Sequence, residues 1–357
     1  MKSKTSESER VSRTASVNQD GLKPLLEIRE LSKHFNIGSG FLKRNAQVLK
    51  AVDEVNLTVF EGETLGIVGE SGCGKSTLGN MIVHLEKPTS GEIIFDQVNM
   101  SKLSSGAIRK KRKDIQMIFQ DPFSSLNPRM NVFDIIAEPL RTHRMAQGEK
   151  LKEEVYKLLD AVGLSSDFAN RFPHQFSGGQ RQRIGIGRAL ALRPKLIVCD
   201  EPVSALDVSI QAQILNLLSV LQQRYNLTYV FIAHGIPAVG YISDRIAVMY
   251  LGRIVEIGKK EDLLRNPNHP YTEGLLGSVP KADPALRGQG KLLEGETPNP
   301  LHLPIGCSFH TRCVYAADRC KTVAPALLKV SEDRYAACHY PLTVNANSDA
   351  GAGGKML

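Results

Sequence analysis

The sequence predicts an α/β fold whose core is a parallel β-sheet with helices packed against it. Two short apolar runs, Leu65 to Val68 and Leu196 to Cys199, are predicted to be strands buried on both faces, which is typical of a parallel sheet. A glycine-rich segment follows the first run, and the carboxylates Asp200 and Glu201 follow the second. Because the carboxyl ends of parallel strands lie at one edge of a sheet, we expect these segments to meet there.

The bulk composition is that of a globular protein with a sizeable core. The chain has 357 residues, 42% of them hydrophobic, enough for one large domain or a domain with a smaller appendage. It contains no run of eighteen apolar residues, so we do not expect it to span a membrane by itself. Residues 1–24 are polar and lack an apolar run, so they are predicted to be a flexible tail and no signal peptide. Residues 344–357 are predicted to be a second flexible tail, and the expected compartment is the reducing cytoplasm.

The formal net charge of +8 comes partly from one basic run, "RKKRKD" at residues 109–114, which is predicted to be a loop. A solvated loop and an attraction to an anionic bilayer surface are both compatible with it. No motif for nucleic-acid recognition accompanies the charge, so no nucleic-acid partner is expected. The charge alone does not choose a function.

The glycine-rich segment "GESGCGKST" fits the pattern of a loop that holds nucleotide phosphates. It follows a predicted strand, and Leu78, Met81, Ile82 and Leu85 then recur at helical spacing. Glycines allow backbone N–H groups to turn toward an anion at the positive end of a helix. The residues expected around the phosphates are Gly69, Glu70, Ser71, Gly72, Cys73, Gly74, Lys75, Ser76 and Thr77. Lys75 would reach the terminal phosphates, and Ser76 would ligate Mg²⁺.

Asp200 and Glu201 complete the chemistry of a nucleotide triphosphatase. At the end of a strand beside the phosphate loop, Asp200 would hold Mg²⁺, directly or through water. Glu201 would polarise the water that attacks the γ-phosphate. An Asp-Glu pair alone is more often a surface cap, so this interpretation depends on the phosphate loop. Cys73 and Cys199, which lie inside these two motifs, are predicted to be small buried side chains.

A third segment, "FSGGQRQRIGIGRALALRP" at residues 176–194, offers a second anion site. Ser177 to Gln180 is predicted to open a helix that Pro194 terminates, so free N–H groups and the helix dipole would point outward. Ser-Gly-Gly is also an ordinary turn sequence, and by itself this segment would favour the turn.

Taken with these motifs, the chain from about residue 25 to 260 resembles the ATP-binding cassette (ABC) ATPases. The family's signature corresponds to "SGGQ", its Q-loop to Gln120 in "MIFQDP", its D-loop to "SALD" at 204–207 and its switch histidine to His234 in "YVFIAHG". The resemblance implies a nucleotide-binding domain over residues 25–260, with an N-terminal antiparallel β subdomain and a helical subdomain inserted at about 121–190. "NVFDIIAEPL" and "LKEEVYKLLDAVGL" carry helical spacing within that insertion.

The resemblance also assigns roles to individual residues. Two nucleotide domains of this family pair head to tail, so the signature would serve the nucleotide of the partner. The residues expected there are Ser177, Gly178, Gly179, Gln180 and Asp207. Gln120 would sense Mg²⁺ and the attacking water, and His234 would hold the γ-phosphate and orient Glu201. Phe35 would stack on adenine. Without the resemblance, Gln120 could be a surface residue and His234 a core histidine.

One departure from the family follows the switch histidine. The family usually has an acidic residue there, whereas Gly235 and Ile236 follow here, and Pro237 fits the first turn of a helix. We expect hydrolysis to survive, because His234 and Glu201 are both present, and the sequence does not determine its rate.

The number of nucleotide-binding motifs and the absence of a heptad repeat favour a transporter subunit over other members of the family. The chain has one phosphate loop, one signature and no sustained heptad pattern, unlike the translation and DNA-repair members. Residues 261–343, including "NPNHPYTEGLLGSVP", resemble the C-terminal extension of dipeptide and oligopeptide importer ATPases, of which nickel importer ATPases are near relatives. The resemblance implies two membrane permeases, a second homologous ATPase subunit or a second copy of this chain, and indirectly an extracytoplasmic binding protein. The expected location is peripheral, on the cytoplasmic face of the inner membrane.

The extension carries four cysteines in the spacing C-x5-C-x6-C-x17-C. These are Cys307, Cys313, Cys320 and Cys338. Clustered thiols in a reducing compartment favour metal ligands over disulfides, and the loose spacing suits a [4Fe–4S] cluster better than zinc. The resembling importer ATPases hold such a cluster here. Zinc, no metal, ligation by His310 or His339, and a metal-sensing module all remain open, as does a nucleic-acid-associated ATPase.

Overall fold

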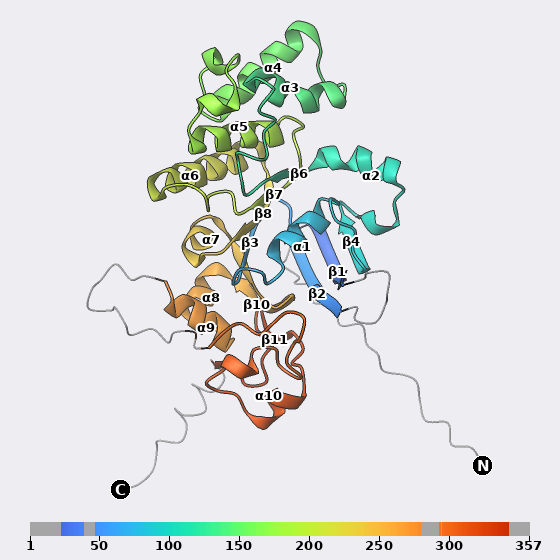
Figure 1. The fold of residues 1–357 in the computed structure, drawn as a ribbon, viewed down its shortest axis with the longest axis vertical. Helices are drawn as coiled ribbons and strands as arrows, with labels where there is room; N and C mark the ends of the chain where they lie inside the picture. The colour runs from blue at the N-terminus through green and yellow to red at the C-terminus, as the bar shows by residue number, and fades with distance from the viewer. Residues whose placement is uncertain (1–22, 39–46, 280–292, 294, 343–357) are drawn as a thin grey trace, which may run out of the picture.

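The computed structural model describes residues 23–38, 47–279, 293 and 295–342 (Figure 1). They form one sheet of eight strands and one of four, with helices on the larger sheet and in a separate layer at one end of the molecule. Of the two predicted tails, residues 1–22 and 344–357 lie outside the described residues. The predicted α/β class, with an antiparallel β subdomain and inserted helices, is confirmed.

The larger sheet contains the predicted parallel core. Its parallel strands, in spatial order, are β9 (Arg245–Tyr250), β3 (Thr64–Val68), β8 (Thr228–Ala233), β7 (Leu196–Asp200) and β6 (Ile115–Ile118). Every residue of β3, β7, β8 and β9 is buried. Two of these are the strands predicted from apolar runs, so the residues after β3 and after β7 lie at the same edge of the sheet.

The C-terminal part of the chain continues this sheet. β10 (Arg253–Lys259) pairs antiparallel with β9, and β12 (Arg334–Ala336) pairs with β10 and with β11 (Leu328–Ser331). Glu256 stands opposite Ala336 in that ladder. The extension is therefore joined to the ATPase-like core through main-chain hydrogen bonds as well as side-chain packing.

The smaller sheet is antiparallel and covers the first helix. Its strands, in spatial order, are β2 (Gln47–Phe60), β1 (Pro24–Ile37), β4 (Ser90–Phe95) and β5 (Val98–Asn99). Helix α1 (Lys75–Ile82) begins at the phosphate loop, and its Leu78 and Met81 are completely buried between the two sheets. One apolar cluster joins Leu26 of β1, Leu78 and Ile232 of β8, so this sheet holds α1 against the core.

The remaining helices pack in two groups. Helices α3 (Val132–Thr142), α4 (Gly148–Ala161) and α5 (Gly178–Leu190) form the upper end of the molecule in Figure 1. The others are α6 (Val208–Tyr225), α7 (Ile236–Ile242), α8 (Lys260–Arg265), α9 (Pro270–Gly277) and α10 (Asp318–Thr322), with short 3-10 turns η2 (Met100–Lys102), η4 (Ser166–Phe168), η5 (Pro173–Gln175) and η7 (His310–Arg312). The predicted helical segments are confirmed, although α5 ends at Leu190, before Pro194. The prediction that Leu85 belongs to the helix after the phosphate loop was wrong: α1 ends at Ile82, His84 has a φ of 56°, and Leu85 is exposed. Within the described part of the chain, no helix is long and apolar enough to cross a bilayer.

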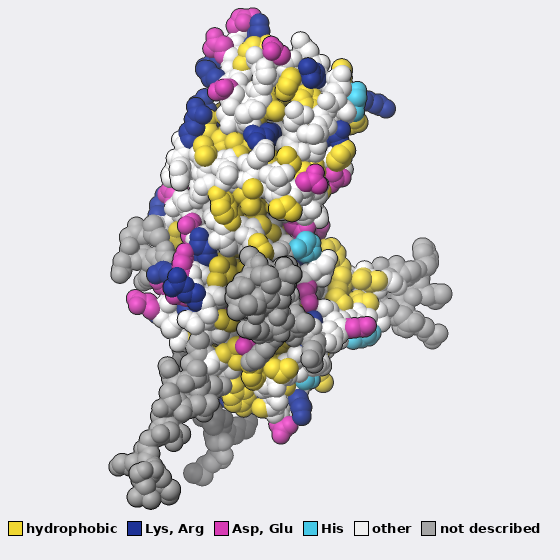
Figure 2. All heavy atoms as spheres, turned by 90° about the vertical axis from the view of Figure 1, so that its left-hand side faces the viewer, with side chains coloured by type: hydrophobic (Ala, Val, Ile, Leu, Met, Phe, Trp, Pro, Cys, Tyr) yellow, Lys and Arg dark blue, Asp and Glu magenta, His cyan; other side chains and the backbone are white. Residues whose placement is uncertain are grey.

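The basic run is helical, so the prediction of a loop was wrong. Residues 109–114 belong to α2 (Ser105–Lys111) and the 3-10 turn η3 (Arg112–Asp114). The side chain of Ser104 accepts a hydrogen bond from the N–H of Ala107 and caps α2. Lys111 lies 3.8 Å from Asp96, and Arg112 donates to the carbonyl of His84 at 2.6 Å. On the face drawn in Figure 2, basic and acidic side chains are interspersed at the end formed by α3 and α4.

Gly66 in β3 provides a test of how tightly α7 packs on the sheet. A Cβ at this position would lie 2.1 Å from Cγ1 of Val239 and 2.4 Å from Oγ of Ser243. We expect Gly66→Ala to lower the free energy of unfolding by about 1–3 kcal/mol through overpacking. Gly185→Ala is the matched control, since its Cβ would meet no atom within 4 Å, and it should gain up to about 1 kcal/mol of helix propensity. Denaturant unfolding measures both, and a Gly66→Ala variant as stable as wild type would contradict this packing.

Candidate active site

The phosphate-loop residues form a tight turn between β3 and α1. The N–H of Cys73 donates to the carbonyl of Glu70 at 3.3 Å, and α1 begins immediately afterwards at Lys75. Gly74 has a φ of 106°, and a Cβ there would lie 2.0 Å from the carbonyl oxygen of Ala51. Only glycine fits both the backbone angle and this close approach to β2. The turn therefore places the loop against the smaller sheet.

Lys75 and Ser76 project from the first turn of α1 toward the end of β7. The Nζ of Lys75, in a side chain only 3% exposed, donates to the carbonyls of Gly69 at 2.7 Å and Glu70 at 2.9 Å. Ser76 Oγ donates to Oδ1 of Asp200 at 3.0 Å. Burial raises the pKa of Asp200, and the Ser76 hydrogen bond opposes this only in part. Two of the three expected magnesium ligands, Ser76 and Asp200, thus lie side by side.

Glu201 is the point at which three predicted catalytic side chains meet. It follows β7 with a φ of 47°, a left-handed conformation that is uncommon for a residue other than glycine. Its Oε1 lies 2.6 Å from Nε2 of His234, at the end of β8. Its Oε2 accepts a hydrogen bond from Nε2 of Gln120 at 2.8 Å. The carboxylate is 4% exposed, so its orientation is set by these two partners.

A cavity of about 330 Å³ joins the phosphate loop to these catalytic candidates. The predicted residues that line it are Phe35, Ser71, Gly72, Gly74, Lys75, Ser76, Thr77, Gln120, Glu201 and His234. The sequence did not indicate the other lining residues, which are Leu49, Lys50, Ala51, Leu251, Gly252, Pro300 and Leu303. No motif marks them, because β2, the β9–β10 turn and the C-terminal extension reach the cavity only through tertiary packing.

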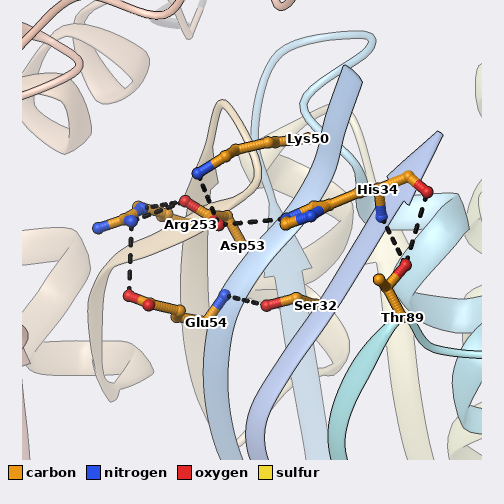
Figure 3. Close-up of polar contacts among 7 residues, drawn as sticks. All are labelled: Ser32, His34, Lys50, Asp53, Glu54, Thr89 and Arg253. Atoms are coloured by element: carbon orange, nitrogen blue, oxygen red, sulfur yellow. Dashed lines mark hydrogen bonds and ion pairs between the residues drawn. The ribbon is translucent and has the colours of Figure 1, made fainter. Parts of the chain in front are cut away.

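A polar network centred on Asp53 includes His34, which directly precedes the cavity-lining Phe35 in the chain (Figure 3). Arg253 donates two hydrogen bonds to Oδ2 of Asp53, at 2.9 and 2.6 Å. Lys50 Nζ and His34 Nε2 each lie 3.5 Å from Oδ1. Burial would raise the pKa of Asp53, but Arg253 and Lys50 outweigh it and lower the pKa below its usual value. The network ties β1, β2 and β10 together beside Phe35.

The signature residues lie elsewhere and do not line the described wall of this cavity. Ser177 caps α5: its Oγ accepts from the N–H of Gln180 at 3.4 Å, and Gln180 Oε1 accepts from the N–H of Ser177 at 3.1 Å. A Cβ on Gly179 would lie 2.5 Å from Cγ2 of Ile210 in α6, so glycine permits the two helix ends to pack. Asp207 is the N-cap residue of α6. The signature and Asp207 therefore form a second surface at two helix N-termini.

The departure after the switch histidine leaves space beside it. Helix α7 begins at Ile236 with Pro237 in its first turn, as predicted. A Cβ on Gly235 would make only an ordinary contact, 3.5 Å from Cδ of Pro237. The absence of a carboxylate here is therefore a difference in charge and not a requirement of packing.

A groove of about 630 Å³ separates the helical layer from the sheet core. Its lining includes Gln116 of β6, Phe119, Glu138 of α3 and Arg188 of α5. Phe119 directly precedes Gln120, so the groove is one residue along the chain from a group that contacts Glu201.

The four cysteines of the extension line one further cavity, of about 20 Å³. All are free thiols, and burial raises the pKa of Cys307, Cys313 and Cys338, the last to about 11. His310 and His339 also line it, although a ring nitrogen of each lies 2.8 Å from a backbone carbonyl. Among the residues that the structure describes, no group of three or more His, Cys, Asp or Glu side chains has the arrangement of a metal-ion site. Cys73 and Cys199 are buried, as predicted.

Comparison with known proteins assigns the two parts of the chain separately. The family described as ABC transporter matches residues 52–204, and the family described as oligopeptide/dipeptide transporter, C-terminal region, matches residues 255–320. The oligopeptide transport ATP-binding protein AppF of Bacillus subtilis is 52% identical over 318 residues, which cover 88% of this chain and 97% of AppF. The chain belongs to the ABC transporter ATP-binding proteins.

Other relatives and solved structures agree with this assignment. The oligopeptide transport ATP-binding protein OppF of Escherichia coli is 51% identical, over 86% of this chain and 94% of OppF. The dimeric post-hydrolysis structure of the ATP-binding cassette MJ0796 bound to ADP and Pi matches with a TM-score of 0.59 and 32% identity, over 66% of this chain and 99% of that one. The likeness to MJ0796 covers about two thirds of this ABC ATPase, and the oligopeptide/dipeptide family matches residues 255–320.

Replacement of Glu201 should separate hydrolysis by this ABC ATPase from nucleotide binding. We expect Glu201→Gln to lower ATP turnover by at least about 100-fold, because the amide cannot accept a proton from water. Affinity for MgATP should remain, since Lys75 and Ser76 are unchanged. Glu149→Gln, whose side chain is 87% exposed in α4, is the matched control and should hydrolyse ATP at the wild-type rate. Equal turnover in the two variants would contradict the assignment.

Proposed function

We propose that this chain is the ATP-hydrolysing subunit that energises an importer of dipeptides or oligopeptides across the cytoplasmic membrane. The convergence of Gln120 and His234 on Glu201, in a cavity lined by Lys75 and Ser76, is the observation that carries the proposal. The C-terminal match to the oligopeptide/dipeptide family and the likeness to AppF and OppF support a peptide as the transported substrate. A nickel or other small-solute importer is the second candidate, because the ATPase itself does not contact the substrate.

In the proposed mechanism, each side chain acts on a different part of MgATP. Adenine would stack on Phe35, the loop amides and Lys75 would hold the phosphates, and Ser76, Asp200 and Gln120 would hold Mg²⁺. The ion, when bound, neutralises charge that develops on the phosphate oxygens. Glu201 accepts a proton from the attacking water while Gln120 and His234 fix its carboxylate. His234 also holds the γ-phosphate.

The second surface implies a partner with a nucleotide site of its own. Because Ser177, Gly179 and Asp207 do not line the described wall of the cavity in their own chain, they are available to a nucleotide that another subunit binds. We propose a head-to-tail pair with a homologous ATPase subunit, or with a second copy of this chain. The likeness to MJ0796, a cassette whose structure with ADP and Pi is a dimer, supports such a pair.

We propose that the membrane subunits bind in the groove beside Gln120. A helix from one of the two permeases would contact α3, α5 and the end of β6, where Glu138, Arg188 and Phe119 lie. Movement of the permease helix in this groove would displace Gln120, and the hydrogen bond from Gln120 would transmit the displacement to Glu201. In the proposed assembly the ATPase is a peripheral subunit on the cytoplasmic face of the membrane, and an extracytoplasmic binding protein delivers the substrate to the permeases.

We also propose that the four cysteines hold a [4Fe–4S] cluster. The supporting observation is that all four thiols line a single cavity, together with the buried ring of Phe309. A four-iron cluster is larger than one ion, so its ligands lie farther apart than those of a mononuclear site. The thiols would have to lose their protons on binding. The raised pKa values of Cys307, Cys313 and Cys338 oppose this loss, and the iron would favour it.

Substrate class is tested with the ATPase, its permeases and its binding protein reconstituted in liposomes. We expect ATP-dependent uptake of labelled di- to pentapeptides, lost in the Glu201→Gln complex and retained in the Glu149→Gln complex. Uptake of Ni²⁺ without peptide uptake would replace the peptide proposal by the nickel one. ATP hydrolysis without either uptake would contradict both.

Anaerobic purification tests the proposed cluster. We expect a brown protein with about four irons and four sulfides per chain, absorbing near 400 nm and bleaching on reduction. Cys313→Ser should lose most of the iron, whereas Cys199→Ala, outside the extension, should keep it. Stoichiometric zinc, or a colourless metal-free protein, would overturn the cluster.

A further inference from the structure

The phosphate loop of this ATPase is held from the outside by the C-terminal extension, through Glu70. Arg312 donates from Nη1 to Oε2 of Glu70 at 2.8 Å and from Nη2 to Oε1 at 3.0 Å, a two-pronged contact across 242 residues of sequence. Thr297 Oγ1 donates to the same Oε2 at 3.0 Å. The Arg312 side chain is only 5% exposed, and paired contacts of this kind fix geometry as well as charge.

The main chain of the loop is held from the same side. The N–H of Glu70 donates to the hydroxyl of Tyr271 at 2.9 Å. Tyr271 is completely buried, and its ring centroid lies 4.5 Å from that of Tyr250 and 5.4 Å from that of Phe309. Rotation of Glu70 would therefore break a side-chain and a backbone contact together.

Glu70 also touches the lysine that reaches the phosphates. The carbonyl of Glu70 accepts a hydrogen bond from Nζ of Lys75 at 2.9 Å. Glu70 is therefore bound by Arg312 and is also in direct contact with Lys75. Burial would raise the pKa of Glu70, but Arg312 and Thr297 outweigh it and lower the pKa. The hydrogen bonds to Glu70 raise the pKa of Arg312. Both groups are therefore charged near neutral pH.

The Arg312–Glu70 contact directly adjoins the cavity that the four cysteines line. Arg312 directly precedes Cys313, and its N–H donates to the carbonyl of Phe309 at 3.0 Å. Phe309 and Cys313 both line that cavity. A change in the position of Cys313 would thus move the residue that holds Glu70.

We propose that Arg312 is a positioning residue for the nucleotide site, which holds the phosphate loop in its ATP-binding shape and links ATP affinity to the state of the cysteine cavity. The inference rests on the proposed binding of MgATP by the loop. Pro300 and Leu303, which lie between Thr297 and Arg312 in the sequence, line the nucleotide cavity directly. The extension is therefore part of the nucleotide site.

A purely structural role of Arg312, without any effect on the nucleotide site, predicts a different outcome. If Arg312 only fastened the extension to the core, its loss would lower stability and leave both kinetic constants unchanged. A positioning residue acts on binding, because the carboxylate of Glu201 is held by His234 and Gln120 and the chemical step stays intact. The split between KM and kcat therefore distinguishes the two roles.

The experiment compares variants of the full chain in the assembled transporter. We expect Arg312→Met to raise the KM for MgATP about tenfold, the order expected for a lost charge-assisted contact, with kcat changed less than about twofold. Arg312→Lys should fall between, because lysine keeps the charge without the two-pronged geometry. Arg319→Met, an exposed arginine of α10, is the control and should behave as wild type. Thr297→Val is a milder change and should raise the KM for MgATP about threefold. It tests the same contact if the Arg312→Met variant does not fold.

Cys313→Ser tests the link to the cavity. We expect it to raise KM about threefold to tenfold, and binding of a fluorescent ATP analogue, measured without turnover, should weaken by the same factor. An unchanged KM in Thr297→Val and in folded Arg312→Met would overturn the positioning role. An unchanged KM in Cys313→Ser alone would overturn the link to the cavity. A wild-type complex that fails to bind MgATP would remove the proposed function itself, whereas wild-type binding with unaffected variants contradicts only this inference.

Discussion

Strands β3, β8 and β7 run parallel and side by side in a sheet that is buried on both faces, so the residues that follow them lie at one edge. This constraint brings together three segments that are far apart in the sequence: the phosphate loop after β3, Asp200 and Glu201 at β7, and His234 after β8. Glu201 leaves its strand in a left-handed conformation and is turned toward His234 and Gln120. The strain of that conformation, of order 1–3 kcal/mol, is sustained by the two hydrogen-bonding partners and by the packing of the sheet.

The sequence was sufficient for the parts of the site that depend on local pattern. Apolar runs of four residues predicted β3 and β7, and helical spacing predicted α1, α3 and α4, because these signals repeat within one element. The convergence on Glu201 came from the resemblance to a family and from strand order, and the close contacts of Gln120 and His234 agree with it. The basic run was misjudged as a loop, since its charges hide a short helix that Ser104 caps.

Contacts between distant segments could not be predicted. Arg312 and Glu70 stand 242 residues apart, and neither belongs to a periodic pattern that points to the other. The same is true of Pro300 and Leu303 in the nucleotide cavity and of Arg253 beside Asp53. These pairs are set by the way β10, β11 and β12 extend the core sheet, which places the extension next to the phosphate loop. The four cysteines, which are clustered in the sequence, were easier to group.

In the proposed head-to-tail pair, a second subunit completes the active site of this ABC ATPase. The position of the signature away from the described wall of its own cavity supports this proposal. A structure of the Glu201→Gln variant with MgATP and its partner ATPase tests this most directly. We expect nucleotide between the phosphate loop of one subunit and Ser177 to Gly179 of the other, with Mg²⁺ at Ser76. Nucleotide bound in a single subunit, with the two signature segments remote from both phosphates, would contradict it.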